Sequence, residues 1–515
     1  MSLLDATVIS RLQIEFRRSM RSLIPALCRE IEHSPRLADE FALPLEYFRF
    51  LGDRLDLSAY SNWKVVGWIE GLNDFMYFLD VLAQSRRERD RRGFADELFM
   101  ECEQKFFENS YLDDLFPPGQ PPFRGLTRRL QSLCRRLALE ITQESIFLDP
   151  EGPFHWMKRR HRPWAIQASF EPSFERAEQG ATIPLGFEGR ALIAPGSVRK
   201  AVGRRPRLAT FVVTNDHITV RANGTYRICT RHGNTIQWHW SIREPFRIRS
   251  PGRLTIGPTL HYGSDREPKS LTVTEAKQIA RIDRAWQAIR RAWPEGHALL
   301  ALLTSRVIPL AAHGVVSFSY RHRPGLSFIN CFDRDNLDLI DDLVHENSHH
   351  HLNLLLRKHV LYRGDRNEQI FYSPWRRSLR PLRGILHATF TFTMGAVLFA
   401  RLSAWAETRD GRAQWREAGL TAHQLVRARF RCFEEIESVR YSLLDLAHAR
   451  RLKWITHAGA RLVTQLEEVI MKADRQIARH RHAVLDSSFG PSLRRHVVEL
   501  AQARRTYGPM NLDQA

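Results

Sequence analysis

Residues 341–356 read DDLVHENSHHHLNLLL, and positions 345–349 of this stretch form the motif HExxH. On an α-helix, residues four apart differ by only about 40° in direction and about 6 Å along the axis, so the imidazoles of His345 and His349 can face one metal ion. Glu346 follows the first histidine and projects close to the same ion without needing to bind it. The stretch therefore predicts a metal-binding helix.

The residues around the motif also favour a helix. Asp335 is a suitable N-cap, because a carboxylate can accept hydrogen bonds from the first unpaired N–H groups of a helix. Three apolar residues before the motif supply a buried face: Leu337, Ile340 and Val344. His350 and His351 lie on other faces, so we expect an indirect or surface role for them rather than ligation. The alternative for all four histidines is a polar helix face that binds nothing.

A metal site of this kind needs at least a third protein ligand. Glu368 follows His349 by nineteen residues, which is the spacing of one large class of zinc peptidases. His387 lies further on, in a stretch with helical spacing that reads RGILH at 383–387. Spacing alone leaves both candidates open.

Residues 372–387 read YSPWRRSLRPLRGILH and are followed by Phe-Thr-Phe at 390–392. With the HENSH helix, a helix ending in Trp293-Pro294 and the Val-Ile-Pro strand at 307–309, this stretch resembles the HExxH-motif peptide-modification proteins. Characterised members of that family are iron- and 2-oxoglutarate-dependent β-hydroxylases of residues in ribosomally made peptides. The resemblance covers about residues 270–410. It implies Fe(II) and 2-oxoglutarate as cofactors, and it favours His387 as the third ligand.

The types of residue near His387 agree with that chemistry. Non-haem Fe(II) needs three protein ligands on one side and open positions for an oxo acid and dioxygen. A dianionic oxo acid also needs a cation, and the planar fork of Arg meets a carboxylate with two hydrogen bonds. Arg383 precedes His387 by one helical turn and Arg380 by about two. We expect Arg380, and next Arg376, to hold the acid; the alternative is that all three arginines are surface charges. Trp375 and Tyr372 are candidates for the pocket wall.

Two other functions fit parts of the pattern. In a zinc metallopeptidase or other hydrolase, Glu346 would be the general base for a zinc-bound water and Glu368 the third ligand. Alternatively, the chain is a peptide-binding module whose metal site is silent. For the oxygenase and for the binding module, we expect the partner to be a precursor peptide or a carrier-bound amino acid in the biosynthesis of a natural product.

The pattern of apolar residues predicts an α+β fold with three regions. Residues 1–175 read mainly as helices, residues 176–270 as a β-rich segment of antiparallel hairpins, and residues 271–515 as a mainly helical catalytic domain that carries the HExxH motif. Within the last region a helix should run from Thr272 to a stop at Pro294. Three strands should follow it: Val307–Leu310, Val315–Tyr320 and Leu326–Cys331.

The composition is that of a globular protein, with 43% hydrophobic and 26% charged residues over 515 positions. No apolar run is long enough for a membrane span and no secretory signal begins the chain, so we expect a soluble cytoplasmic protein with no membrane partner. Six isolated cysteines predict reduced core thiols. The net charge of +20 either forms a groove for a polyanion or an acidic peptide, or it is scattered over the surface. Without a dense basic block, we expect no nucleic-acid partner. The oligomeric state is left open.

Overall fold

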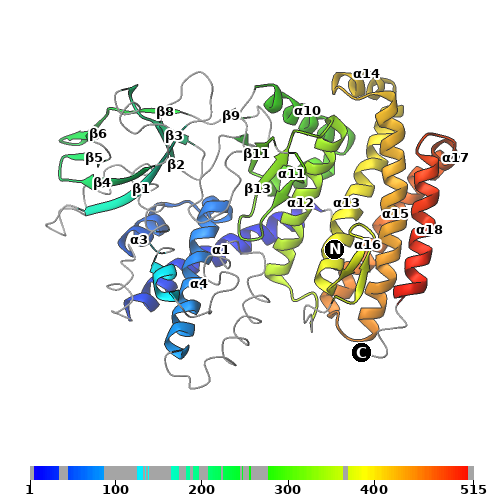
Figure 1. The fold of residues 1–515 in the computed structure, drawn as a ribbon, viewed down its shortest axis with the longest axis horizontal. Coiled ribbons are helices and arrows are strands. Elements are labelled where there is room, and N and C mark those ends of the chain that lie inside the picture. Colours follow the sequence, from blue (N-terminus) through cyan, green and yellow to red (C-terminus); the bar gives the residue numbers. More distant parts are fainter. Residues whose placement is uncertain are drawn as a thin grey trace.

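The computed structural model describes residues 5–33, 45–85, 125–131, 134, 137, 164–172, 181–185, 190–196, 207–221, 224–243, 246–247, 255–256, 276–311, 313–363 and 369–508. Within these residues, helices lie towards both ends of the chain and strands in the middle, which confirms the predicted α+β class. Figure 1 shows the large sheet at one end of the molecule and the long C-terminal helices at the other.

The N-terminal helices share a hydrophobic core with the HExxH region. They are α1 (Ala6–Glu32), α3 (Leu45–Arg54), the short 3₁₀ helix η1 (Leu57–Ser61) and α4 (Trp63–Ser85). Asp5 caps α1 by accepting from the Thr7 N–H at 2.9 Å. One face of α1, including Ile9, Phe16 and Ile24, belongs to the same core cluster as Leu343 and Leu352 of the HExxH helix. The N-terminal helices therefore support the helix that carries the motif.

An eight-stranded antiparallel sheet occupies the predicted β-rich segment. Its strands are β1 (Trp164–Pro172), β2 (Ala181–Leu185), β3 (Arg190–Ile193), β4 (Arg207–Val213), β5 (His217–Arg221), β6 (Thr225–His232), β7 (Thr235–Trp238) and β8 (Ser241–Arg243), in the order β7-β6-β5-β4-β1-β2-β3-β8. The β6–β7 hairpin turns at Gly233, whose φ of 62° suits a glycine. β1 lies wholly within residues 1–175, which were predicted to be mainly helical, so the boundary expected at 176 is too late. Trp164, Ile166 and Phe170 are residue types that favour a strand at this position.

A smaller mixed sheet lies against the HExxH helix. Its strands are β9 (Phe246–Arg247), β10 (Thr255–Ile256), β11 (Arg306–Leu310), β12 (Phe318–Ser319) and β13 (Leu326–Asn330), in the order β12-β13-β11-β10-β9. β11 is parallel to both neighbours, whereas β12 runs antiparallel to β13. Every residue of β11 and β13 is buried. The three predicted strands are confirmed, and β12 is the outermost of the described strands on its side of the sheet.

Helices dominate the rest of the described chain (Figure 1). They are α10 (Ala276–Ala292), α11 (Pro294–Leu303), α12 (Asn336–Lys358), α13 (Leu382–Glu407), α14 (Arg409–Glu417), α15 (Ala422–Arg451), α16 (His457–Ile477), the 3₁₀ helix η3 (Ala478–His480), α17 (Arg481–Leu485) and α18 (Gly490–Tyr507). Thr272, where α10 was expected to begin, lies outside the described residues. Pro294 ends α10 as predicted and also opens α11, which the sequence did not predict, by taking its first position.

Between α12 and α13 the chain forms a short hairpin of β14 (Phe371–Ser373) and β15 (Ser378–Arg380). Its four-residue turn contains Arg377 at a φ of 52°, which is unusual for a residue with a side chain. Pro374 lies in the turn of this strand pair, and Pro381 directly precedes α13.

α13 is apolar and long enough to span a membrane by composition alone, but 78% of its most apolar window is buried inside the protein. It packs against α12, α15 and α16 and forms the centre of the C-terminal bundle. This burial is typical of the core helix of a soluble protein. Among the described cysteines, Cys28, Cys134, Cys229, Cys331 and Cys432 are buried thiols without disulfides, as predicted.

Candidate metal centre

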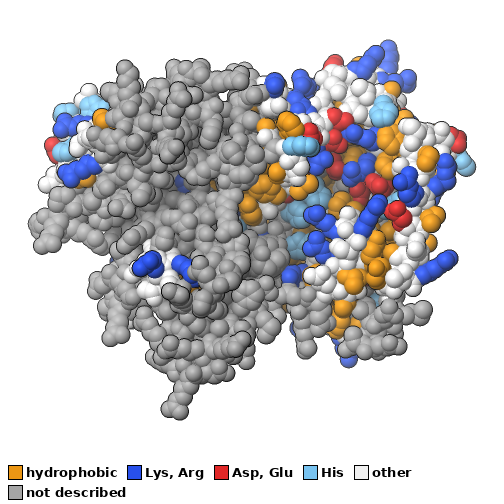
Figure 2. All heavy atoms as spheres, viewed as in Figure 1, with side chains coloured by type: hydrophobic (Ala, Val, Ile, Leu, Met, Phe, Trp, Pro, Cys, Tyr) orange, Lys and Arg blue, Asp and Glu red, His pale blue; other side chains and the backbone are white. Residues whose placement is uncertain are grey.

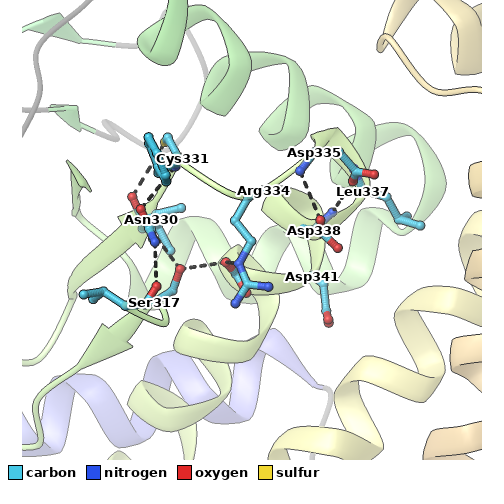
Figure 3. Close-up of polar contacts among 12 residues, drawn as sticks. Ser317, Asn330, Cys331, Arg334, Asp335, Leu337, Asp338 and Asp341 are labelled. Atoms are coloured by element: carbon cyan, nitrogen blue, oxygen red, sulfur yellow. Dashed lines mark hydrogen bonds and ion pairs between the residues drawn. The ribbon is translucent and has the colours of Figure 1, made fainter. Parts of the chain in front are cut away.

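The start of α12 is fixed by a capping box and by an arginine from α15. The Asp335 carboxylate accepts from the N–H groups of Leu337 and Asp338, and Asp338 accepts from the Asp335 N–H at 3.0 Å. Arg427 donates to Asp335 at 2.6 Å and to Asp338 at 3.0 Å. Figure 3 shows these carboxylates at the end of the helix, with Asp341 one turn further on. The predicted Asp335 cap is confirmed, and it fixes the residue at which the HExxH helix begins.

His345 and His349 lie side by side on that face. Their ring centroids are 5.0 Å apart and the ring planes are inclined by 77°. Phe392 of α13 packs edge-on against His345 at 5.0 Å. The separation follows from the four-residue spacing on a helix, so the two imidazoles can reach a shared ion.

His387 reaches the same place from the second turn of α13. Its ring centroid lies 6.1 Å from that of His349, with the planes 31° apart. The structure thus brings together the three histidines that the sequence singled out. Glu368, the alternative third ligand, lies outside the described residues.

The three imidazoles fit a metal cation. Burial lowers the pKa of His345, of His349 and of His387, the last to about 4, so each ring is neutral near pH 7. None of the three rings forms a hydrogen bond with another described residue, so their nitrogen lone pairs are available. A neutral imidazole with an unused nitrogen is the form that ligates a metal.

Glu346 lies closer to His345 and His349 than the sequence motif alone predicts. Its carboxylate oxygen and one nitrogen each of His345 and His349 lie within 4.8 Å of one another, a set that does not include His387. Ser319 of β12 donates to Glu346 Oε2 at 2.7 Å. Burial raises the pKa of Glu346 to about 8, although the Ser319 hydrogen bond acts in the opposite direction. Glu346 can therefore act as a ligand, as a proton carrier or as a residue that orients a ligand.

A cavity of about 760 Å³ opens over the metal-ligand cluster, which is the name used below for His345, His349 and His387. Its walls come from the β12 segment 316–321, the α12 face, the β14–β15 hairpin and the start of α13. Figure 2 shows histidine side chains on the same face of the molecule as mixed acidic and basic groups. A cavity of this size accommodates more than a small organic acid.

The predicted arginines divide into two groups. Arg376 in the hairpin turn and Arg380 at the end of β15 line the cavity, and neither forms an ion pair with another described residue. Arg383 is not among the lining residues, although its charge helps to lower the pKa of His387 after burial and Arg321. Arg377, between the first two, pairs with Glu499 of α18 at 3.2 Å.

Trp375 lines the cavity as predicted, and it also connects the hairpin to α15. Its ring stacks on Phe392 at 4.4 Å with the planes 6° apart, and its Nε1–H donates to Glu435 at 2.8 Å. Arg431 donates to the same carboxylate at 2.8 Å and reaches Asp341 at 3.4 Å. These contacts lie next to His345, since Phe392 packs against its ring.

Tyr372 does not line the cavity. It stacks on Tyr507 of α18 at 5.3 Å and packs edge-on against Tyr441 of α15 at 5.7 Å. The proposed role of Tyr372 in the pocket wall is therefore wrong; alternate residues of β14 face opposite sides, and Tyr372 faces away from the metal-ligand cluster.

A surface role for His350 and His351 is also wrong, because both side chains are buried. The His350 ring contacts Ser327 of β13 at 3.1 Å and accepts from the Gly325 N–H at 3.4 Å. His351 packs edge-on against Phe390 at 5.1 Å. The sequence missed this because α12 is covered on more than one side, by β13 and by α13.

Sequence reasoning missed four residues that shape the site. Ser319 holds Glu346, Arg431 closes the α15 side, and Arg321 and Asn353 line the far end of the cavity. Asn353 carried a signal, since it continues the four-residue series of His345 and His349. Arg321 and Arg431 carried none, because only the fold brings them to the motif.

No protein-family model matches this chain, and none of the curated proteins compared with it is similar enough to count as a match. The resemblance to HExxH-motif peptide-modification proteins therefore stays a prediction based on the residues quoted above.

Proposed function

We propose that the protein is an Fe(II)- and 2-oxoglutarate-dependent oxygenase that hydroxylates a peptide or a carrier-bound amino acid. The observation that carries the proposal is the combination in one cavity of three neutral imidazoles with Arg376 and Arg380, which form no ion pair with a described carboxylate. Guanidinium groups beside a metal site that lack an ion-pair partner favour an anionic co-substrate.

In this proposal His345, His349 and His387 hold the iron. Arg380, with Arg376 beside it, binds the carboxylate of 2-oxoglutarate that is remote from the metal. Bound iron would activate dioxygen, and the oxo acid would supply two of the electrons that reduce it. Glu346, held by Ser319, orients a neighbouring ligand or water, and Trp375 keeps the hairpin arginines in place by its contacts with Phe392 and Glu435.

The test is anaerobic addition of Fe(II) and then 2-oxoglutarate to the metal-free full-length protein. We expect a weak visible charge-transfer band that requires both additions, and succinate formation once air is admitted. A protein that binds iron but gives neither the band nor succinate would contradict the proposal.

A zinc hydrolase is the second candidate, and the position of Glu346 favours it. A buried carboxylate that lies beside two histidines and accepts a hydrogen bond from Ser319 is placed to accept a proton from a metal-bound water, since a bound cation would favour its ionised form. This function predicts that zinc survives purification and that model peptides are cleaved. Glu346→Gln would then abolish cleavage while zinc content stays unchanged, whereas an oxygenase would show no cleavage at all. Retention of peptide binding without either activity would instead identify a binding module.

The substrate and the location are also part of the proposal. A cavity of about 760 Å³ leaves room for a residue of a peptide or carrier beside the oxo acid. The described cysteines are buried thiols, which fits a reducing compartment such as the cytoplasm. A short precursor peptide encoded beside this reading frame would support the assignment to natural-product biosynthesis.

A further inference from the structure

The cavity contains a second set of polar groups at the end formed by β12, opposite the hairpin. Arg321 follows this strand and lines the cavity, and its side chain forms no ion pair with another described residue. Arg321 belongs to the segment after β12, whereas Arg376 and Arg380 belong to the β14–β15 hairpin, so separate elements bring these guanidinium groups to the cavity. The charge of Arg321 acts on the carboxyl group of Asp74 in α4, although the two side chains form no ion pair.

Asn353 lies at the same end. It is four residues after His349, so it continues the helix face that carries the ligands. Its side chain is 7% exposed and lines the cavity, and its Oδ1 has no hydrogen-bond partner. A buried amide that is left unpaired costs about 1–3 kcal/mol, which a bound polar ligand would remove. Arg321 and Asn353 also both line a smaller adjoining pocket under α1, so they lie close together.

The edge of β12 borders this end of the cavity. In the described part of the chain, no strand pairs with its outer side. The side chains of Ser317 and Ser319 reach α12 by hydrogen bonds to Asp342 and Glu346, while Phe318 stacks on Phe328 at 4.6 Å. Since the side chains are used on the two faces of the sheet, the outer backbone groups are the part of β12 that can pair with another chain.

Resting on the proposed function, we propose that the substrate is an acidic peptide that adds as an extended strand to β12, with one carboxylate side chain held by Arg321 and Asn353. Pairing with an edge strand gives affinity from the peptide backbone, and the Arg321–Asn353 pair gives selectivity for a carboxylate. An acidic partner also suits a chain with a net charge of +20. The hairpin arginines bind the co-substrate and the β12 end binds the substrate.

The test uses fluorescein-labelled decapeptide pools, randomised except for a central Asp, Asn or Lys, with the iron-loaded full-length protein and fluorescence anisotropy. We expect the Asp pool to bind about tenfold more tightly than the Asn pool, in line with a hydrogen bond to a charged group. Arg321→Gln should abolish that preference and Asn353→Leu should weaken it. Arg363→Gln, at an exposed arginine outside the cavity, is the matched control. N-methylation on both sides of the central Asp should remove most of the binding.

Three results would overturn the inference. They are equal binding of the Asp and Asn pools, an Asp preference that survives Arg321→Gln, and loss of the 2-oxoglutarate charge-transfer band in Arg321→Gln, which would assign Arg321 to the co-substrate. If the wild-type protein shows no such band but keeps an Asp preference that depends on Arg321, the peptide site stands and the oxygenase proposal fails.

Discussion

The arginines on two walls of the same cavity differ in their ion pairing. On the α15 wall, Arg431 pairs with Glu435 at 2.8 Å, and with Asp341 and Glu434 at 3.4 Å. On the wall formed by the β14–β15 hairpin, Arg376 and Arg380 pair with no described carboxylate. A compensated arginine holds helices together, whereas an uncompensated one is available to a ligand. The partners of an arginine, and not its presence near a motif, therefore indicate its role.

The largest effect should come from removing the central member of the metal-ligand cluster. His349→Ala is expected to reduce bound metal to background and to lower activity by more than about 100-fold, because loss of a ligand exceeds the effect of losing its supporting contacts. Metal analysis after dialysis measures this. His313→Ala, at an exposed histidine paired with Asp333, is the control and should keep its metal.

The third ligand can be identified by metal affinity in three variants. We expect His387→Ala to weaken iron binding by more than about 100-fold, because it removes a ligand and not a supporting contact, while Glu368→Ala leaves iron binding unchanged. Glu346→Gln should retain iron if Glu346 only orients its neighbours. Loss of metal in the Glu368 variant alone would remove His387 from the cluster and support the zinc hydrolase.

Substitution of the ion-paired arginine on the α15 wall should change the stability of the protein. Arg431→Ala leaves the buried Glu435 carboxylate without its cation, which should lower the free energy of unfolding by about 3 kcal/mol. Chemical denaturation of the metal-free protein measures this change. A variant as stable as the wild type would show that Arg431 serves a ligand rather than the fold.

Substitution of an arginine on the hairpin wall should instead change the binding of the co-substrate. Arg380→Ala is expected to raise the KM for 2-oxoglutarate by about 10-fold to 100-fold, the value of a hydrogen bond to a charged group, with little change in Tm. Arg380→Lys should restore binding only in part, because an ammonium group cannot form the two parallel hydrogen bonds. A drop in Tm with an unchanged KM would reverse the contrast between the walls.

A smaller effect is expected at His322, next to Arg321. Arg321 is exposed to the cavity, but His322 is buried, and burial lowers its pKa to about 4. As the pH falls, His322 is therefore protonated in the unfolded chain before it is protonated in the folded protein. The stability that the neutral ring contributes above pH 6.5 is lost progressively towards pH 4. The difference in free energy of unfolding between His322→Gln and the wild type should therefore depend on pH. It should shift by about 1 kcal/mol in favour of the variant when the pH is lowered from 7.5 to 5.5. An identical difference at both pH values would contradict this.

Local patterns predicted the parts of the site that depend on neighbouring residues. The four-residue spacing of His345 and His349 fixes their common face, and Asp335 caps their helix, because both effects act within a few turns. His387 was predicted from a resemblance, and the fold brings it beside His349.

The rest was decided by the tertiary structure. Arg321, Ser319 and Arg431 come from separate elements, and nothing in their neighbouring residues indicates that they meet at the motif. The sequence by itself determined a capped helix with two imidazoles on one side, since helix geometry is a local property of the chain. Only packing determined which charges are neutralised and which face the cavity, because ion pairing and burial depend on elements that are far apart in the sequence.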